Sequence, residues 1–226
     1  MRVGHEAGRD AFLQALGALL AAVEGLDDEA FVAASRCRGW TVGDVLVHVH
    51  LGLQECLLGL LDPTGAAPDT DAAGYWRVEL PTNDTGADAL AGVRFVRLLG
   101  AAYRRPSGVV GHLRPTVRGV GRAVRSLPDG ALAFQGRVLL TGDFLATWAV
   151  ELAVHHLDLT RELDLAAPAP AALALARQTV EALAGGPLPP DWDDERAVLI
   201  GTGRRPPTAA EGTQVGPLPH PLPVLG

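Results

Sequence analysis

The chain of 226 residues contains no lysine, only two cysteines and no long apolar run. Cys37 and Cys56 form no C-x-x-C pattern, so we expect two reduced, partly buried thiols rather than a disulfide framework or a thiolate metal site. No segment reaches the roughly 18 consecutive apolar residues of a membrane span. The first ten residues, MRVGHEAGRD, lack the apolar core of a secretory signal. These absences predict a cytoplasmic protein that does not interact with membranes.

Charge and composition narrow the class further. The formal net charge of −7 argues against general nucleic-acid binding. Hydrophobic residues make up 48% of the chain and aromatic residues only 5%. Ala and Leu, which favour helices, dominate the apolar fraction, whereas strand-forming β-branched and aromatic residues are modest. The composition therefore predicts an all-α or mostly helical protein.

Helical periodicity recurs along the chain. The clearest start is Thr41-Val42-Gly43-Asp44, which has the form of a capping box with Trp40 as the preceding apolar residue. We favour a capping role for Asp44 in this helix. In the predicted helix at 108–127, we expect Pro115 to bend or break the segment. The predicted helices cover residues 6–26, 41–61, 86–103, 108–127, 141–163 and 171–183, while 193–200 forms a short helix or strand.

Two segments are rich in proline and polar residues. The first, residues 63–84, is typical of a long loop. Between the two segments, residues 135–140 are predicted to form a short extended stretch. It leads into the helix that begins near Thr141, which is a candidate cap residue. The tail, 204–226, holds six prolines and is predicted to lack regular structure. We therefore expect a helical domain over 1–203 and an appended Pro-rich tail.

Arginines are concentrated between residues 94 and 137. This stretch contains nine arginines and only one acidic residue, Asp129. Arg114, Arg118, Arg122 and Arg125 would form a single stripe on a helix. Such a stripe is either a solvated helix face or a basic wall that attracts an anionic ligand.

The predicted helix at 141–163 carries Glu151 and His155 four residues apart, and therefore on the same face. A carboxylate and an imidazole placed in this way can bind one cation if a third ligand arrives from another helix. Asp158, three residues after His155, lies on that face and can hold the far nitrogen of the imidazole. His156 is rotated well away from Glu151.

The helix at 41–61 can offer the third ligand, because it carries His48 and His50. These two histidines point to different sides of the helix, so they cannot easily both serve one site. One of these histidines with Glu151 and His155 would give three ligands and leave positions for water or substrate, as in catalytic zinc centres. The same residues are also compatible with a salt-bridged or hydrogen-bonded group that holds no metal.

Two motifs resemble a known family. The stretch RCRGWTVGDVLVHVHLG resembles the C-x-G-W-T-V-x-D-x-x-x-H segment of the mycothiol-dependent maleylpyruvate isomerase N-terminal domain family, part of the DinB-like superfamily. The stretch GDFLATWAVELAVHHLDLTREL resembles its E-L-x-x-H-x-x-D-L helix, and AVLIGTGRRPPTAAEG resembles its closing segment. Together these stretches span both ends of a domain over residues 6–212.

The resemblance implies an all-α, DinB-like four-helix bundle with additional short helices and an irregular Pro-rich tail. It also implies a divalent metal, typically zinc and in some relatives nickel, held by His48, Glu151 and His155. Characterised relatives use the metal to activate a low-molecular-weight thiol such as mycothiol, which then adds to an electrophilic or anionic substrate. The expected protein is a metal-dependent thiol transferase or isomerase, monomeric or homodimeric.

Two departures limit what carries over. Many relatives have an Arg three residues before the metal-binding Glu, where this chain has Trp148, and the isomerase has a further C-terminal domain for which too little chain remains here. The isomerase's substrate is therefore not assumed. A non-enzymatic bundle that binds a metal or small ligand, as a sensor or scaffold, is the competing interpretation.

Overall fold

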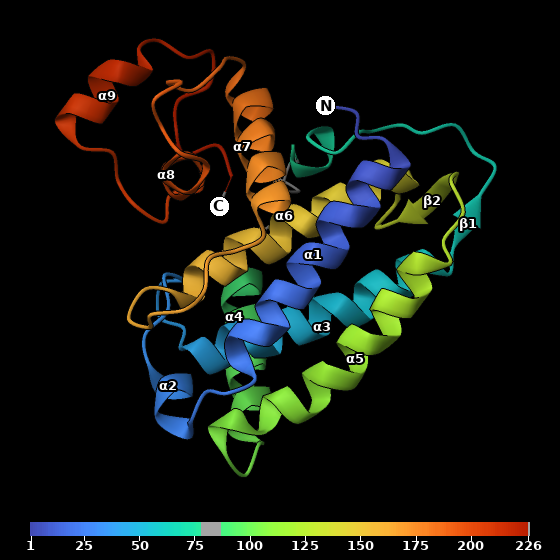
Figure 1. Ribbon diagram of the computed structural model, residues 1–226, viewed down its shortest axis with the longest axis vertical. Coiled ribbons are helices and arrows are strands. Elements are labelled where there is room, and N and C mark those ends of the chain that lie inside the picture. Colours follow the sequence, from blue (N-terminus) through green and yellow to red (C-terminus); the bar gives the residue numbers. More distant parts are fainter. Residues whose placement is uncertain (78–86, 226) are drawn as a thin grey trace.

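The structure is a computed structural model that describes residues 1–77 and 87–225. Most of these residues are helical, and a small antiparallel sheet lies beside them (Figure 1). The helices are α1 (His5–Val23), α2 (Asp28–Val32), α3 (Val42–Leu60), α4 (Ala87–Ala101), α5 (Val109–Arg125), α6 (Thr141–Leu159), α7 (Pro170–Ala184), α8 (Asp194–Gly201) and α9 (Ala209–Val215), with 3-10 turns at Gly74–Trp76 and Pro106–Gly108; the strands are β1 (Pro63–Thr64), β2 (Ala131–Phe134) and β3 (Arg137–Leu140).

Four helices, α1, α3, α5 and α6, form a bundle in which each packs against two of the others (Figure 1). Helix α4 lies beside α3, while α7 packs on α6 and α1 and carries α8 and the C-terminal segment. The predicted all-α class and four-helix bundle are confirmed. Among the described residues, no helix combines the length and the apolar character needed to cross a membrane.

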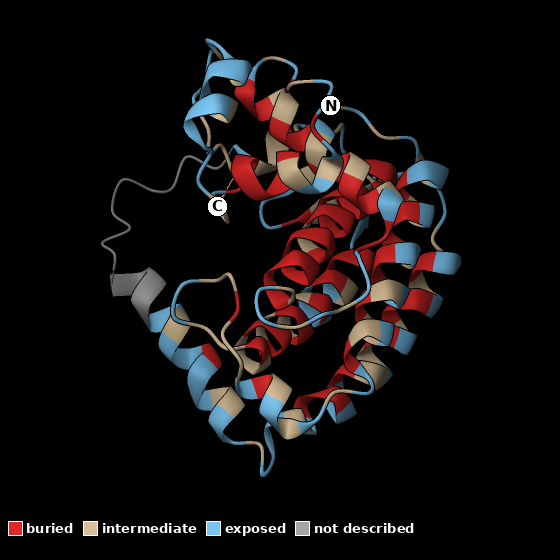
Figure 2. Cartoon of the chain, turned by 60° about the vertical axis from the view of Figure 1, so that its left-hand side comes forward, coloured by how far each residue is buried: buried red, intermediate tan, exposed pale blue. Residues whose placement is uncertain are grey.

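Helix α6 lies at the centre of the hydrophobic core. All of its residues are buried except Glu151, whose side chain is 27% exposed (Figure 2). A helix that is apolar on nearly every side belongs inside a bundle. The single break in its burial is therefore a carboxylate, which marks where the core opens to solvent.

The crossing of α1 and α6 depends on two glycines. A Cβ at Gly8 would collide with the backbone of Gly142, and a Cβ at Gly142 would collide with the backbone of Val3 and Gly4. Only residues without a side chain allow the two backbones to approach this closely. The N-terminal segment is thus pressed directly onto the first turn of α6.

Both ends of α6 are also held by hydrogen bonds. At the first turn, the fully buried Asp143 accepts a hydrogen bond of 2.8 Å from the backbone N–H of Val3. At the last turn, Arg36 donates from its backbone N–H to the carbonyl of Asp158 (3.0 Å) and from Nε to the carbonyl of Leu157 (3.1 Å). The bonds from Arg36 reach carbonyl groups of the last turn, which a helix end leaves without partners in the helix.

The sheet leads directly into α6. Strands β2 and β3 form a hairpin whose turn residues, Gln135 and Gly136, both have positive φ, as a tight two-residue turn requires. The expected extended stretch is therefore β3 together with this turn. Thr141 is not the helix cap, since Leu140 occupies that position. The Thr141 hydroxyl instead donates to Asp129 (3.2 Å) and accepts from the N–H of Gly130.

The expected loop at 63–84 is more ordered than its composition predicts, as far as it is described. Its first residues form β1, paired with β2, and Asp69 exchanges two hydrogen bonds of 3.0 Å with the backbone of Val138. The aromatic pair Tyr75–Trp76 folds back onto the bundle, with Tyr75 stacked 6.2 Å from Phe134. Residues 78–84 lie outside the described residues.

Pro115 does not break its segment into two helices, because α5 runs through it without interruption. A proline inside a helix costs about 3 kcal/mol. Burial of a large aliphatic side chain contributes about 1.5–3 kcal/mol, and α5 buries Leu113, Val117, Val120 and Val124 on the bundle. Packing on this one face therefore outweighs the local penalty.

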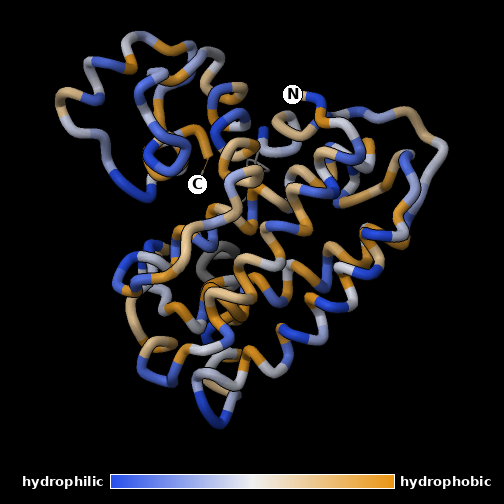
Figure 3. Tube along the Cα trace, viewed as in Figure 1, coloured by the Kyte–Doolittle hydropathy of each residue, from blue (hydrophilic) through white to orange (hydrophobic). Residues whose placement is uncertain are grey.

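The Arg stripe lies on the outer surface of α5, where hydrophilic residues recur along the helix (Figure 3). Arg118, Arg122 and Arg125 are exposed beside a groove between α5 and α1, and Arg114 is paired with Glu24 at 2.6 Å. This arrangement fits the interpretation as a solvated helix face.

The Pro-rich tail is largely irregular, but it contains one helix that was not predicted. Thr208 and Glu211 form a capping box that starts α9. Trp192 is buried in a separate small hydrophobic cluster with residues of α7 and α8, and its indole N–H donates to Gln214 of α9 at 3.0 Å. A strong cap and one side-chain anchor offset the prolines that flank this helix.

Candidate metal centre

His48 reaches the candidate site from α3, whose start is fixed by the predicted capping box. The N–H of Thr41 donates to the Asp44 carboxylate (2.9 Å), and the N–H of Asp44 donates to the Thr41 hydroxyl (3.2 Å). Asp44 therefore caps the helix, as favoured from the sequence. The Trp40 ring lies 5.4 Å from the His48 ring, centroid to centroid.

The structure brings His48, Glu151 and His155 together. Glu151 Oε1 lies 3.3 Å from His48 Nε2 and 3.1 Å from His155 Nε2. The two imidazole rings are 4.8 Å apart and nearly perpendicular, so their edges converge on the same carboxylate oxygen. Two helices thus supply three candidate ligand atoms that all lie within 4.8 Å of one another.

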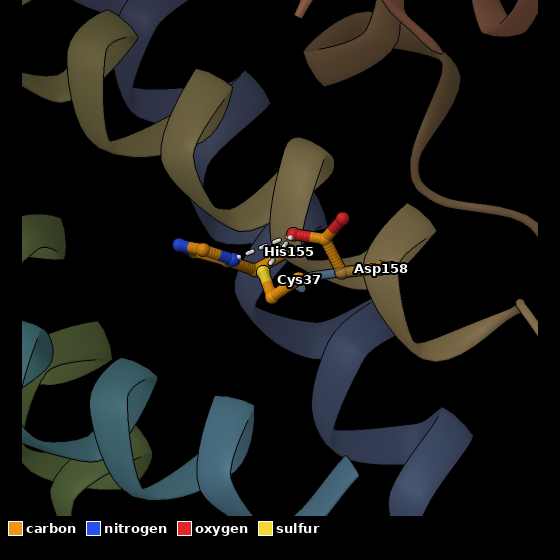
Figure 4. A group of neighbouring side chains, drawn as sticks. All are labelled: Cys37, His155 and Asp158. Carbon is orange, nitrogen blue, oxygen red and sulfur yellow. Dashed lines mark hydrogen bonds and ion pairs between the residues drawn. The ribbon is translucent and has the colours of Figure 1, made fainter. Parts of the chain in front are cut away.

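The other nitrogen of His155 faces Asp158, as the sequence spacing predicts. His155 Nδ1 is 2.9 Å from Asp158 Oδ2, and the Asp158 side chain is fully buried. Two further groups that the sequence did not indicate meet this carboxylate. Cys37 Sγ donates to Oδ2 at 3.0 Å, and Arg204 Nε donates to Oδ1 at 3.2 Å (Figure 4 shows Cys37 and His155 directed at Asp158).

The charges in this group support one another. Burial raises the pKa of Glu151. The charge and hydrogen bond of His155, together with those of His48, lower it by more than burial raises it, so the pKa lies well below its usual range. Burial lowers the pKa of His155, but the charge of Glu151 and the hydrogen bonds with Asp158, Cys37 and Glu151 raise it well above 6.5. Without a metal ion, the two neighbouring carboxylates therefore favour the protonated form of His155.

These positions fit a divalent metal. Zinc bonds of about 2.0–2.2 Å arranged tetrahedrally place adjacent ligand atoms about 3.3 Å apart. The two distances between nitrogen and Glu151 Oε1, 3.3 and 3.1 Å, match that spacing. The bond between Asp158 and His155 Nδ1 also fixes the tautomer whose Nε2 carries the lone pair. A cation could therefore replace the proton on His155 Nε2 with little movement.

A second group, Cys37, His155 and Asp158, also offers three ligand atoms within 4.8 Å (Figure 4). It is less suited to a cation, because the Arg204 guanidinium contacts both oxygens of Asp158, at 3.2 and 3.4 Å. A buried carboxylate already paired with a guanidinium gains little from a second positive charge. We therefore interpret Cys37 and Asp158 as supports of His155.

The remaining histidines of these two helices lie elsewhere. His50 is buried and lines a pocket of about 320 Å³ with Tyr103 and His112 between α3, α4 and α5, and burial lowers its pKa. His156 is buried too, and burial lowers its pKa. Both belong to helix faces turned away from Glu151, as the helical spacing predicts for His156.

Two aromatic residues, Trp148 and Tyr75, lie near Glu151. Trp148 lies one turn before Glu151 and packs against Gly52, which is one turn after His48. Burial, together with the nearby charges of Glu151 and Glu55, raises the pKa of Tyr75 to about 12. Trp148 therefore provides an apolar contact between α6 and α3, one turn away from Glu151.

Comparisons with known proteins agree with this architecture. The family model described as the mycothiol maleylpyruvate isomerase N-terminal domain matches residues 12–160, more than half of the chain. The crystal structure of the mycothiol-dependent maleylpyruvate isomerase is similar to this chain, with a TM-score of 0.55 at 14% identity, covering 83% of this chain and 75% of that one. The structure of a histidine-to-alanine mutant of that isomerase is similar with a TM-score of 0.53 at 13% identity, with the same coverage. No protein in the curated set matches.

Proposed function

Because the chain belongs to the mycothiol maleylpyruvate isomerase N-terminal domain family, we propose that it binds a divalent metal and acts on a low-molecular-weight thiol. His48, Glu151 and His155 are the proposed ligands, and zinc is the proposed metal, with nickel as the alternative. The proposed reaction is a thiol transfer or isomerisation with mycothiol or a similar thiol and an electrophilic or anionic substrate.

The observation that carries this proposal is the convergence of two imidazole nitrogens on one Glu151 oxygen. That oxygen belongs to the one residue of α6 that is not buried, and the His48 side chain is 37% exposed. Three ligands on one side and solvent on the other are typical of a metal centre that leaves room for a substrate.

The chain's own residues have separable roles in this proposal. When bound, a divalent cation would favour the thiolate form of a thiol at the site, which is its nucleophilic form. Asp158 fixes the ring of His155 through Nδ1, so that Nε2 faces Glu151. Trp148 and Trp40 lie beside the ligands from α3 and α6, where they can exclude water from a bound thiol.

Metal content tests the ligand assignment. Elemental analysis of protein purified without chelators is expected to find about one zinc or nickel per chain. His48→Ala and His155→Ala are expected to lose it, while His112→Ala, which removes an exposed histidine of α5, retains it. Full metal content in both of the first two variants would show that the ligands are wrong.

Turnover tests the reaction separately. The metal-loaded protein is incubated with mycothiol and a panel of electrophiles that includes maleylpyruvate, and loss of free thiol and formation of product are followed. Product that depends on both thiol and His48 supports the enzyme. Stoichiometric metal with saturating thiol and no product from any electrophile would favour the binding protein instead.

A further inference from the structure

Asp158 is a fully buried carboxylate that is shared by three distant parts of the chain. It lies in the last turn of α6 and accepts hydrogen bonds from His155 on its own helix, from Cys37 in the segment before α3, and from Arg204 just after α8. The Asp158 side chain has no exposed surface, and that of Arg204 is only 14% exposed. The carboxylate therefore links α6 to the segment before α3 and to the segment after α8.

A carboxylate removed from water needs a compensating charge. Arg204 is the group that supplies it in addition to His155. Its Nε lies 3.2 Å from Asp158 Oδ1 and its Nη2 lies 3.4 Å from Oδ2, so the planar guanidinium faces both oxygens. Among the described residues, Arg204 is the one arginine that hydrogen-bonds to the Asp158 carboxylate.

Arg204 is itself held in place. Its Nη1 donates to the carbonyl of Thr202 at 3.0 Å, at the end of α8. The buried residues of α8 pack in turn against α7 and α6. The guanidinium is therefore presented by a folded element of the C-terminal region.

We infer that Arg204 is a positioning residue of the metal centre. It neutralises and orients Asp158, which in turn holds the His155 ring in the orientation that binds metal. This inference rests on the proposed function only in requiring a metal at His48, Glu151 and His155. It adds that a residue beyond the family-matched segment, which ends at residue 160, completes the centre.

A purely anchoring role makes a different prediction. If Arg204 only fastened the C-terminal segment, its loss would release that segment, as detected by faster limited proteolysis after residue 204, and would leave the metal affinity unchanged. A positioning role predicts weaker metal binding. Loss of such an outer partner typically weakens metal binding about 10- to 100-fold.

The experiment compares zinc affinity, by competition with a chromophoric chelator, in the full chain and in Arg204→Gln. Arg205→Gln is the matched control, because Arg205 is adjacent but binds Glu211 at 2.7 and 2.9 Å and does not contact Asp158. Arg204→Lys keeps the charge with a single donor group and is expected to fall between the parent and Arg204→Gln.

Zinc affinity at least about tenfold lower in Arg204→Gln, with Arg205→Gln within about threefold of the parent, would support the inference. Parental affinity in Arg204→Gln would overturn it. If Arg204→Gln does not fold, unchanged affinity in Arg204→Lys would overturn it, because a lysine cannot hold both oxygens of Asp158 in one plane.

A second readout separates this inference from the proposed function. In metal-free protein, the His155 Nδ1–H that donates to Asp158 should give a slowly exchanging imidazole proton signal by NMR. We expect that signal in the parent and in Arg205→Gln, and its loss in Arg204→Gln. If the parent protein binds no zinc, the proposed metal ligands are wrong, but the positioning role of Arg204 can still be tested by this signal. Persistence of the signal in Arg204→Gln would refute the positioning role.

Discussion

Metal binding should release one proton from His155, and this can be measured without any knowledge of the substrate. In the metal-free protein, His155 faces Glu151 through Nε2 (3.1 Å) and Asp158 through Nδ1 (2.9 Å). Burial lowers the pKa of His155, but the charge of Glu151 and the surrounding hydrogen bonds raise it well above 6.5. A ligating imidazole must give up the Nε2 proton. Its Nδ1 proton can stay on the bond to Asp158.

The magnitude follows from this count. Below the folded-state pKa of His155, one proton is released per metal bound, so zinc affinity should rise about tenfold for each unit of pH. The assay is a competition titration at several pH values between about 6.5 and 8, corrected for proton binding by the chelator. Calorimetry in buffers with different ionisation enthalpies counts the released proton independently.

A slope near zero would refute the reasoning, because it would mean that His155 is already free to ligate. A slope near two would mean that a second group also carries a proton that the metal displaces. The stability of the metal-free protein provides a second check, because the contribution of His155 to stability falls as pH rises, whereas metal affinity increases. The raised pKa of His155 adds stability below pH 6.5 that is lost as pH rises through its folded-state value, and the lowered pKa of Glu151 adds stability above pH 4.5. Their joint contribution is therefore largest between these two pH values.

Three further predictions concern stability and are checked by chemical denaturation. Gly8→Ala should destabilise the protein by about 1–3 kcal/mol, because its Cβ would meet the backbone of Gly142 at the α1–α6 crossing. Gly17→Ala, in the same helix but with open space around it, should instead stabilise by about 0.5–1 kcal/mol, and equal effects of the two changes would contradict the close approach. Thr41→Ala should cost about 1 kcal/mol through loss of the α3 cap, whereas Thr41→Ser should cost much less; equal losses would argue against the capping bond.

The helical spacing of α6 is sufficient to place part of the site. Glu151, His155 and Asp158 lie on one face because the helix repeats about every 3.6 residues, and no tertiary information is needed for that. The same geometry turns His156 away. The helix carrying His48 and its capping box at Thr41 could also be predicted, since both depend on residues close together in the sequence.

The rest depends on contacts between distant segments. Cys37 lies in a segment without helical periodicity, and Arg204 follows α8 by a few residues, so neither spacing points to Asp158. Thr141 resembles a cap by residue type, but β3 continues to Leu140 and leaves Thr141 inside the helix. Pro115 was expected to disturb α5, but burial of one whole face decides the outcome.

The attachment of α6 at both ends has a consequence for the kinetics of metal uptake. Asp143 fastens its first turn to Val3, and Arg36 fastens its last turn at Leu157 and Asp158, so the helix has little freedom to slide or unwind between them. Glu151 and His155 therefore keep their spacing before any ion arrives. An incoming ion need not wait for the chain to fold around it, in contrast to small zinc domains that are unfolded without metal. The rate of uptake should be set by loss of water from the ion and of the proton from His155.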